Sequence, residues 1–287
     1  MTVAGITRVA VVGAGTMGQG IAQVFATARY EVTVVDSAPG ATDRAIGALE
    51  KALSRSVDRG RMTSDERDAT LGRIATSTDL GAVGGHDLVV EAVFEQLDVK
   101  RDVFRVVAPL LGDDALLVSN TSSLSISALA GGLPAPDHFA GLHFFNPVPV
   151  LPLVEIVRGL ATSDDTVTRL TAVVESLGKS GVVVRDSPGF IVNRVLIPMI
   201  NEAVTCLEHG VANRDAIDAS MRLGANHPMG PLQLADLIGL DVCLHIMEAL
   251  HTDLGEDRYR PAPLLRRMVA AGYLGRKSGQ GFHDYAE

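Results

Sequence analysis

The sequence predicts an α/β domain with a mainly parallel sheet, followed by a smaller domain of helices alone. Two observations support this prediction. Up to about residue 186, short apolar runs typical of buried strands alternate with helical segments, which is the order expected of a parallel sheet covered by helices. Beyond Ser187, helical periodicity continues without strand-like runs between the helices. The 287 residues suffice for two such domains, which we expect at 1–186 and 187–287.

The chain is predicted to begin with a strand, a glycine turn, a helix and a second strand. Val9–Val12 is an apolar run that enters a glycine-rich turn, after which apolar side chains recur at helical spacing from Ile21 to Ala26. The second strand, at 31–35, is followed directly by Asp36. The pattern indicates a βαβ unit with an acidic residue at the end of its second strand.

The later segments continue the alternation and then change to helices. Further strands are predicted at 88–92, 115–119, 139–145, 153–157 and 181–184, and helices of the first domain at about 41–59, 64–71 and 99–110. In the second domain, helices are predicted at 190–207, 214–223, 231–250 and 263–271. Their apolar surface predicts that this domain forms a homodimer interface and one wall of the substrate cleft.

Composition excludes several classes of function. The formal net charge of -9 argues against nucleic acid or an anionic membrane as a partner, because either would require a basic surface. With only Cys206 and Cys243, the chain has neither a disulfide scaffold nor a cysteine-rich metal site, and we expect no metal. No apolar run approaches the length of about twenty residues that a membrane span needs. We expect a cytoplasmic protein that binds a small molecule.

The glycine-rich turn is a candidate dinucleotide site. It comprises Gly13, Ala14, Gly15, Thr16, Met17 and Gly18. Such glycines allow a tight turn, close approach of a pyrophosphate and close packing of helix on strand, while the helix N-terminus faces the phosphates. Asp36 stands where a carboxylate would bind the ribose hydroxyls and repel a 2′-phosphate, which favours NAD over NADP. A Rossmann-type domain that binds NAD is predicted, and FAD or a turn without a cofactor are the alternatives.

His143 and Glu155 form the candidate catalytic pair. They lie on two neighbouring predicted strands, so the sheet can bring an imidazole and a carboxylate together. A carboxylate on one ring nitrogen fixes the tautomer and leaves the other nitrogen to accept a proton, as a general base requires. On this segment alone, a core histidine beside an edge-strand glutamate remains an equal alternative.

Two further polar groups are candidates for substrate contact. The loop at 119–123 follows a strand at its carboxyl end, where ligands of open α/β sheets gather. Some of its hydroxyls are also expected to cap the next helix. Asn193 has apolar neighbours near the start of a helix, and its amide can donate either to a substrate carbonyl or to a packing partner.

A basic stripe is predicted on the first polar helix. Lys51, Arg55 and Arg59 are four residues apart and therefore share one side of that helix. They are candidates to bind the phosphates of a substrate. A solvated helical face, with Glu50 and Asp58 nearby, is the alternative.

Nearly the whole chain resembles the L-3-hydroxyacyl-CoA dehydrogenase family, and especially its short bacterial members that act on 3-hydroxybutyryl-CoA. The motifs that resemble the family, in order and spacing, are GAGTMG at 13–18 with Asp36, SNTSSLSI at 119–126, GLHFFNPVPVLPLVEIV at 141–157, DSPGFIVNR at 186–194 and HPMGPLQLADLIGLD at 227–241.

This resemblance implies NAD-dependent oxidation of a (3S)-3-hydroxyacyl-CoA and a role for each matching residue. His143 would be the base and Glu155 its partner, while Ser122 and Asn193 would bind the substrate. The implied cofactor contacts beyond the glycine turn are Glu95, Lys100, Ser122, Asn146 and Lys277. Relatives often have a serine where this chain has Ala52, in the part of the polar helix that would face CoA, so a carrier-protein thioester stays open as the substrate.

Alternatives to this reaction are a related dehydrogenase acting on a sugar acid or a carrier-bound acyl group, and a protein that binds NAD only as a sensor or structural element. The β-hydroxyacid dehydrogenases use a lysine four residues before the interdomain asparagine, and here that position is Gly189.

Overall fold

The structure is a computed structural model that describes residue 3 and residues 5–285. It divides into two compact units, of which one ends at Asp186 and the other begins at Ser187. Each unit has its own hydrophobic core.

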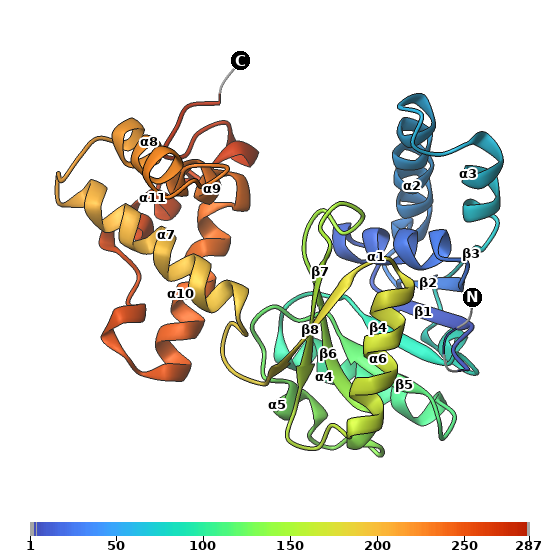
Figure 1. Ribbon diagram of the computed structural model, residues 1–287. Coiled ribbons are helices and arrows are strands. Elements are labelled where there is room, and N and C mark those ends of the chain that lie inside the picture. Colours follow the sequence, from blue (N-terminus) through green and yellow to red (C-terminus); the bar gives the residue numbers. More distant parts are fainter. Residues whose placement is uncertain (1–2, 4, 286–287) are drawn as a thin grey trace. The chain divides into compact units, whose positions relative to one another are not determined.

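The described part of the first unit contains one eight-stranded sheet with the strand order β3-β2-β1-β4-β5-β6-β7-β8 (Figure 1). Neighbouring strands run parallel except β6 and β7, which are antiparallel. The predicted mainly parallel sheet is thereby confirmed. The strands are β1 (Arg8–Val12), β2 (Glu31–Val35), β3 (Ile74–Ser77), β4 (Leu88–Glu91), β5 (Leu116–Ser119), β6 (Phe139–Phe144), β7 (Leu153–Arg158) and β8 (Ser180–Arg185).

Helices and short turns connect these strands. They are α1 (Thr16–Thr27), α2 (Ala41–Asp58), α3 (Ser64–Leu71), α4 (Leu97–Val107), α5 (Ile126–Ala130) and α6 (Asp164–Ser176), with short 3₁₀ turns η1 (Leu80–Val83), η2 (Ala108–Leu110) and η3 (Pro136–His138). The core combines strand residues such as Val9 and Val90, which are fully buried, with Phe25 of α1 and Leu170 of α6. Removing such apolar side chains from water is the main contribution that holds helices on the sheet.

Strand β3 and helix α6 were not predicted. Strand β3 lies at the edge of the sheet and is only half-buried, so its side chains lack the apolar run of an inner strand. Helix α6 has polar residues between its buried positions, which include Leu170, Val173 and Val174. It packs on β7 and β8, and Ser163 caps its N-terminus by accepting the Thr166 N–H. Its narrow apolar stripe is a weak signal in the sequence.

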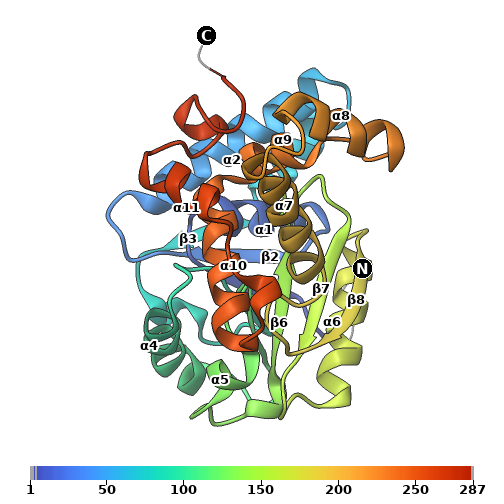
Figure 2. The same ribbon diagram turned by 90° about the vertical axis from the view of Figure 1, so that its left-hand side faces the viewer.

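The second unit is helical, as predicted. Its helices are α7 (Val192–Glu208), α8 (Arg214–Gly224), α9 (Pro231–Ile238), α10 (Leu240–Leu254) and α11 (Pro263–Ala270), with 3₁₀ turns η4 (Asp257–Tyr259) and η5 (Arg276–Ser278). Figure 2 shows α7 beside α10, and these two helices are in contact. The single helix predicted at 231–250 is wrong, because Gly239 with φ 105° separates α9 from α10. An L side chain rarely adopts that conformation.

Candidate cofactor and catalytic site

The turn between β1 and α1 has the shape of a phosphate cradle. Gly13 has φ 110°, and a Cβ on it would lie 2.5 Å from the carbonyl oxygen of Ala92. A Cβ on Gly18 would lie 1.8 Å from the carbonyl oxygen of Gly13, so a larger residue would push α1 away from the turn. A Cβ on Gly15 would meet no described atom within 4 Å. The backbone at Gly15, which is the N-cap of α1, is therefore open to an anion at the positive end of the helix.

Asp36 is joined directly to this turn. Its carboxylate accepts the Ala14 N–H at 2.8 Å and the Ala38 N–H at 2.9 Å, and it follows β2 at the carboxyl end of the sheet. The carboxylate, the open backbone and the helix N-terminus are the groups that a ribose and a pyrophosphate require. The residues present therefore fit a dinucleotide.

His143 and Glu155 face each other across the antiparallel pair formed by β6 and β7. They are register partners, and the His143 Nδ1–H donates to Glu155 Oε2 at 2.8 Å. Both side chains are buried, with 5% and 1% exposed. Phe145 packs on the imidazole with ring centroids 4.4 Å apart. A proton held on Nδ1 puts the lone pair of the neutral imidazole on Nε2, where a general base needs it.

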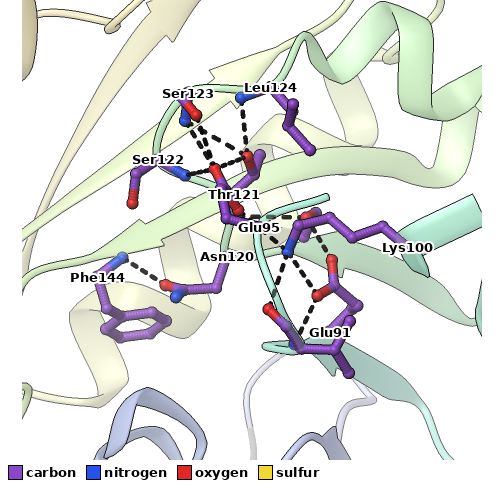
Figure 3. Close-up of polar contacts among 11 residues, drawn as sticks. Glu91, Glu95, Lys100, Asn120, Thr121, Ser122, Ser123, Leu124 and Phe144 are labelled. Carbon is purple, nitrogen blue, oxygen red and sulfur yellow. Dashed lines mark hydrogen bonds and ion pairs between the residues drawn. The ribbon is translucent and has the colours of Figure 1, made fainter. Parts of the chain in front are cut away.

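The loop after β5 is fixed by one carboxylate (Figure 3). Glu95 Oε1 accepts the Thr121 hydroxyl at 2.5 Å, the Ser122 N–H at 2.8 Å and the Ser123 N–H at 2.9 Å. Asn120, in the same loop, accepts the Phe144 N–H at 2.9 Å through its Oδ1 and so joins β5 to the end of β6. Ser122 is thereby held on the loop next to the strand that bears His143.

Lys100 lies beneath this loop. Its side chain is 1% exposed, and its ammonium pairs with Glu91 at 2.7 Å and with Glu95 at 3.3 Å. Glu91 was not singled out from the sequence, although an acidic residue that closes the apolar run 88–90 is an unusual feature that could have drawn attention.

The electrostatics of Glu95 reflect these contacts. Burial raises the pKa of its carboxyl more than any other single influence does, but the Lys100 charge and the donors Thr121, Ser122 and Ser123 together hold that pKa below its usual value. Glu95 is therefore ionised at neutral pH and remains a strong acceptor for the loop.

The other predicted site residues lie elsewhere. Asn146 lies two residues beyond the end of β6 and is exposed. Lys51, Arg55 and Arg59 are exposed along α2 and its C-cap, and the Arg55 Nε–H donates to the Lys51 carbonyl oxygen. The remaining two belong to the helical unit: Asn193 is the second residue of α7, and Lys277 in η5 pairs with Asp241 at 2.6 Å.

The described residues include neither a candidate membrane span nor a candidate metal cluster. Within residue 3 and residues 5–285, no helix is both long enough and apolar enough to cross a bilayer. The same residues contain no group of three or more His, Cys, Asp or Glu side chains arranged to hold a metal ion.

Two family models match almost the whole chain. The NAD-binding domain of 3-hydroxyacyl-CoA dehydrogenase matches residues 8–187, and the C-terminal domain of the same family matches residues 189–285.

Similar proteins and structures agree with these matches. A probable 3-hydroxybutyryl-CoA dehydrogenase of Deinococcus radiodurans is 51% identical over 96% of this chain and 99% of its own. One from Bacillus subtilis is 48% identical over 98% of both chains. The crystal structure of (S)-3-hydroxybutyryl-CoA dehydrogenase from Ralstonia eutropha has a TM-score of 0.95 at 45% identity and covers 98% of this chain and 100% of its own. The chain therefore belongs to the 3-hydroxyacyl-CoA dehydrogenase family, with an NAD-binding domain at residues 8–187.

Proposed function

We propose that the protein interconverts (3S)-3-hydroxybutyryl-CoA and its 3-oxo form with NAD. The buried, hydrogen-bonded pair of His143 and Glu155 is the observation that carries the proposal. An imidazole held by a carboxylate, at the carboxyl end of an NAD-binding sheet, is the arrangement that a general base requires. The substrate is proposed from the relatives, whose names specify 3-hydroxybutyryl-CoA.

In the proposed reaction, His143 removes the proton of the 3-hydroxyl group through Nε2. The C3–H bond would break as the carbonyl forms, and NAD held by the glycine turn and Asp36 would supply the acceptor for the hydride. Glu155 stabilises the imidazolium that His143 becomes, because the carboxylate charge lies next to the new positive charge. Ser122 and Asn193 would hold the substrate oxygens, and in the reverse direction the imidazolium returns its proton.

We assign the cofactor contacts as follows. The turn at 13–18 would hold the pyrophosphate, and Asp36 would hold the adenosine ribose. The remaining proposed cofactor contacts are Glu95, Lys100, Ser122, Asn146 and Lys277. Lys51, Arg55 and Arg59 would meet phosphates of CoA, and their exposure on α2 supports that assignment.

The decisive assay follows NADH oxidation with acetoacetyl-CoA, with longer 3-oxoacyl-CoA esters and with acetoacetyl groups on a carrier protein. We expect the highest kcat/KM with acetoacetyl-CoA. In the other direction, the 3S ester should be oxidised and the 3R ester should serve as the inactive control. If the protein binds NADH but reduces no 3-oxoacyl thioester, the proposal is wrong and a sensor or structural role is favoured.

We also propose that the protein is a cytoplasmic homodimer that associates through its helical unit. Four apolar side chains of that unit are from 49% to 86% exposed, which supports an interface there: Val195, Val211, Leu223 and Leu237. Light scattering at micromolar concentration should give twice the mass of the chain. A monomer under these conditions would contradict the proposed dimer.

A further inference from the structure

Glu91 is a fully buried carboxylate with three donors around it. Its Oε1 accepts the Val93 N–H and the Lys100 ammonium, each at 2.7 Å, and its Oε2 accepts the Ser119 hydroxyl at 2.6 Å. These donors come from the loop after β4, from α4 and from the end of β5. One carboxylate thus joins three elements at the carboxyl end of the sheet.

The contacts continue outward from Glu91 to the polar loop (Figure 3). Lys100 reaches Glu95 Oε2 at 3.3 Å, and the other oxygen of Glu95 holds the backbone of Ser122. Two carboxylates therefore share one ammonium, and this acidic cluster of Glu91, Lys100 and Glu95 has a formal charge of one negative unit. Glu95 is the outermost member, with 29% of its side chain exposed.

The acidic cluster lies on one side of the point where the order of the strands reverses. Asp36 follows β2 on one side of β1, whereas Glu91 and Glu95 follow β4 on the other side. A dinucleotide crosses an open sheet at this switch point. If the adenosine end of the dinucleotide lies at Asp36, its nicotinamide half lies on the side of β4 and β5, next to the acidic cluster.

The two redox forms of the cofactor differ in charge at this half. The nicotinamide ring has one positive charge in NAD⁺ and none in NADH. A fixed negative charge nearby stabilises the cationic ring and leaves the neutral ring almost unaffected, and the effect is larger where protein excludes water.

We propose that Glu91 is a positioning residue whose charge, held next to Lys100 and Glu95, raises the affinity of the site for NAD⁺ relative to its affinity for NADH. The proposal rests on the proposed function, since it assumes that NAD is the cofactor. Without the Glu91 charge the cluster would be formally neutral, with one carboxylate and one ammonium. One unit charge at about 10 Å, in surroundings of intermediate dielectric constant, corresponds to about a 3- to 10-fold difference in relative affinity.

The test is Glu91→Gln, which removes the charge and keeps the shape. The amide oxygen can accept from Val93 and Lys100, and the amide NH₂ can donate to the Ser119 oxygen. The dissociation constants of NADH and NAD⁺ would be measured separately, by fluorescence and by calorimetry. We expect the ratio of NAD⁺ to NADH affinity to fall by about 3- to 10-fold. A purely structural role would weaken both forms alike, and that result would overturn the proposal.

Ser119→Ala is the matched control. It removes a hydrogen bond to the same carboxylate without changing the charge, so the affinity ratio should stay that of the parent. If Glu91→Gln does not fold, Glu95→Gln removes one charge from the same cluster at a more exposed position and should shift the ratio in the same direction. If a folded variant that lacks one of these charges keeps the parent ratio of NAD⁺ to NADH affinity, the proposal about Glu91 is overturned. If that variant still oxidises (3S)-3-hydroxybutyryl-CoA, the proposed function is unaffected by this result.

Discussion

Replacing His143 by glutamine is expected to lower kcat by about 10²- to 10⁴-fold, the usual contribution of a general base. The amide can still donate to Glu155, so the buried carboxylate keeps a hydrogen-bond donor and the fold should persist. An amide cannot accept the hydroxyl proton of the substrate, however. The loss should therefore appear in kcat, while the affinity for NADH stays close to that of the parent because the glycine turn and Asp36 are unchanged.

The measurement is steady-state reduction of acetoacetyl-CoA, together with NADH binding and thermal unfolding. His138→Gln is a matched control, because His138 immediately precedes the opposite end of β6. It should keep the parent kcat. Parent-like turnover in His143→Gln would refute the assignment of His143 as the base. A fall in Tm with loss of NADH binding would instead indicate that the histidine serves the fold.

The sheet could be predicted because its inner strands are buried on both faces and therefore read as continuous apolar runs. The edge strand β3 lacks such a continuous apolar run. Strand β3 has an intermediate-exposed-exposed-intermediate burial pattern, so only pairing with β2 identifies it as a strand. The break at Gly239 was missed because apolar side chains continue on both sides of it, and a single glycine within such a run does not decide between a bend and a helix.

The pairing of His143 with Glu155 was predictable because both lie on strands separated by a short connection. The acidic cluster of Glu91, Lys100 and Glu95 could not be predicted from the sequence. Glu91 finds its partners at Lys100 and Ser119, which are 9 and 28 residues away on different elements. Neither spacing corresponds to a local motif, so only the folded sheet brings the three side chains together. Lys100 illustrates the same limit, since resemblance implied a cofactor contact but did not indicate that this lysine is buried between two acids.

The second large effect is expected for Glu155→Gln. The carboxylate can only accept, so it requires a proton on His143 Nδ1 and leaves Nε2 to act as the base. An amide can instead turn its NH₂ toward Nδ1, which favours the opposite tautomer and removes the lone pair from Nε2. It also provides no negative charge next to the imidazolium. The corresponding change of carboxylate to amide, Asp to Asn, at the buried aspartate of serine proteases lowers kcat by about 10⁴-fold, and we expect a loss of about 10²- to 10⁴-fold here.

The fold should tolerate this substitution, because glutamine has the size of glutamate and can pair with either imidazole tautomer. Thermal unfolding and NADH titration would establish that the variant is folded and binds its cofactor. Glu175→Gln, the same change at an exposed position of α6, is the matched control and should keep the parent kcat. A loss confined to kcat would identify the carboxylate as the group that orients and charges the base. Near-normal turnover in Glu155→Gln would mean that His143 needs no anionic partner. Glu155 would then be a buried acid of the sheet without a role in catalysis.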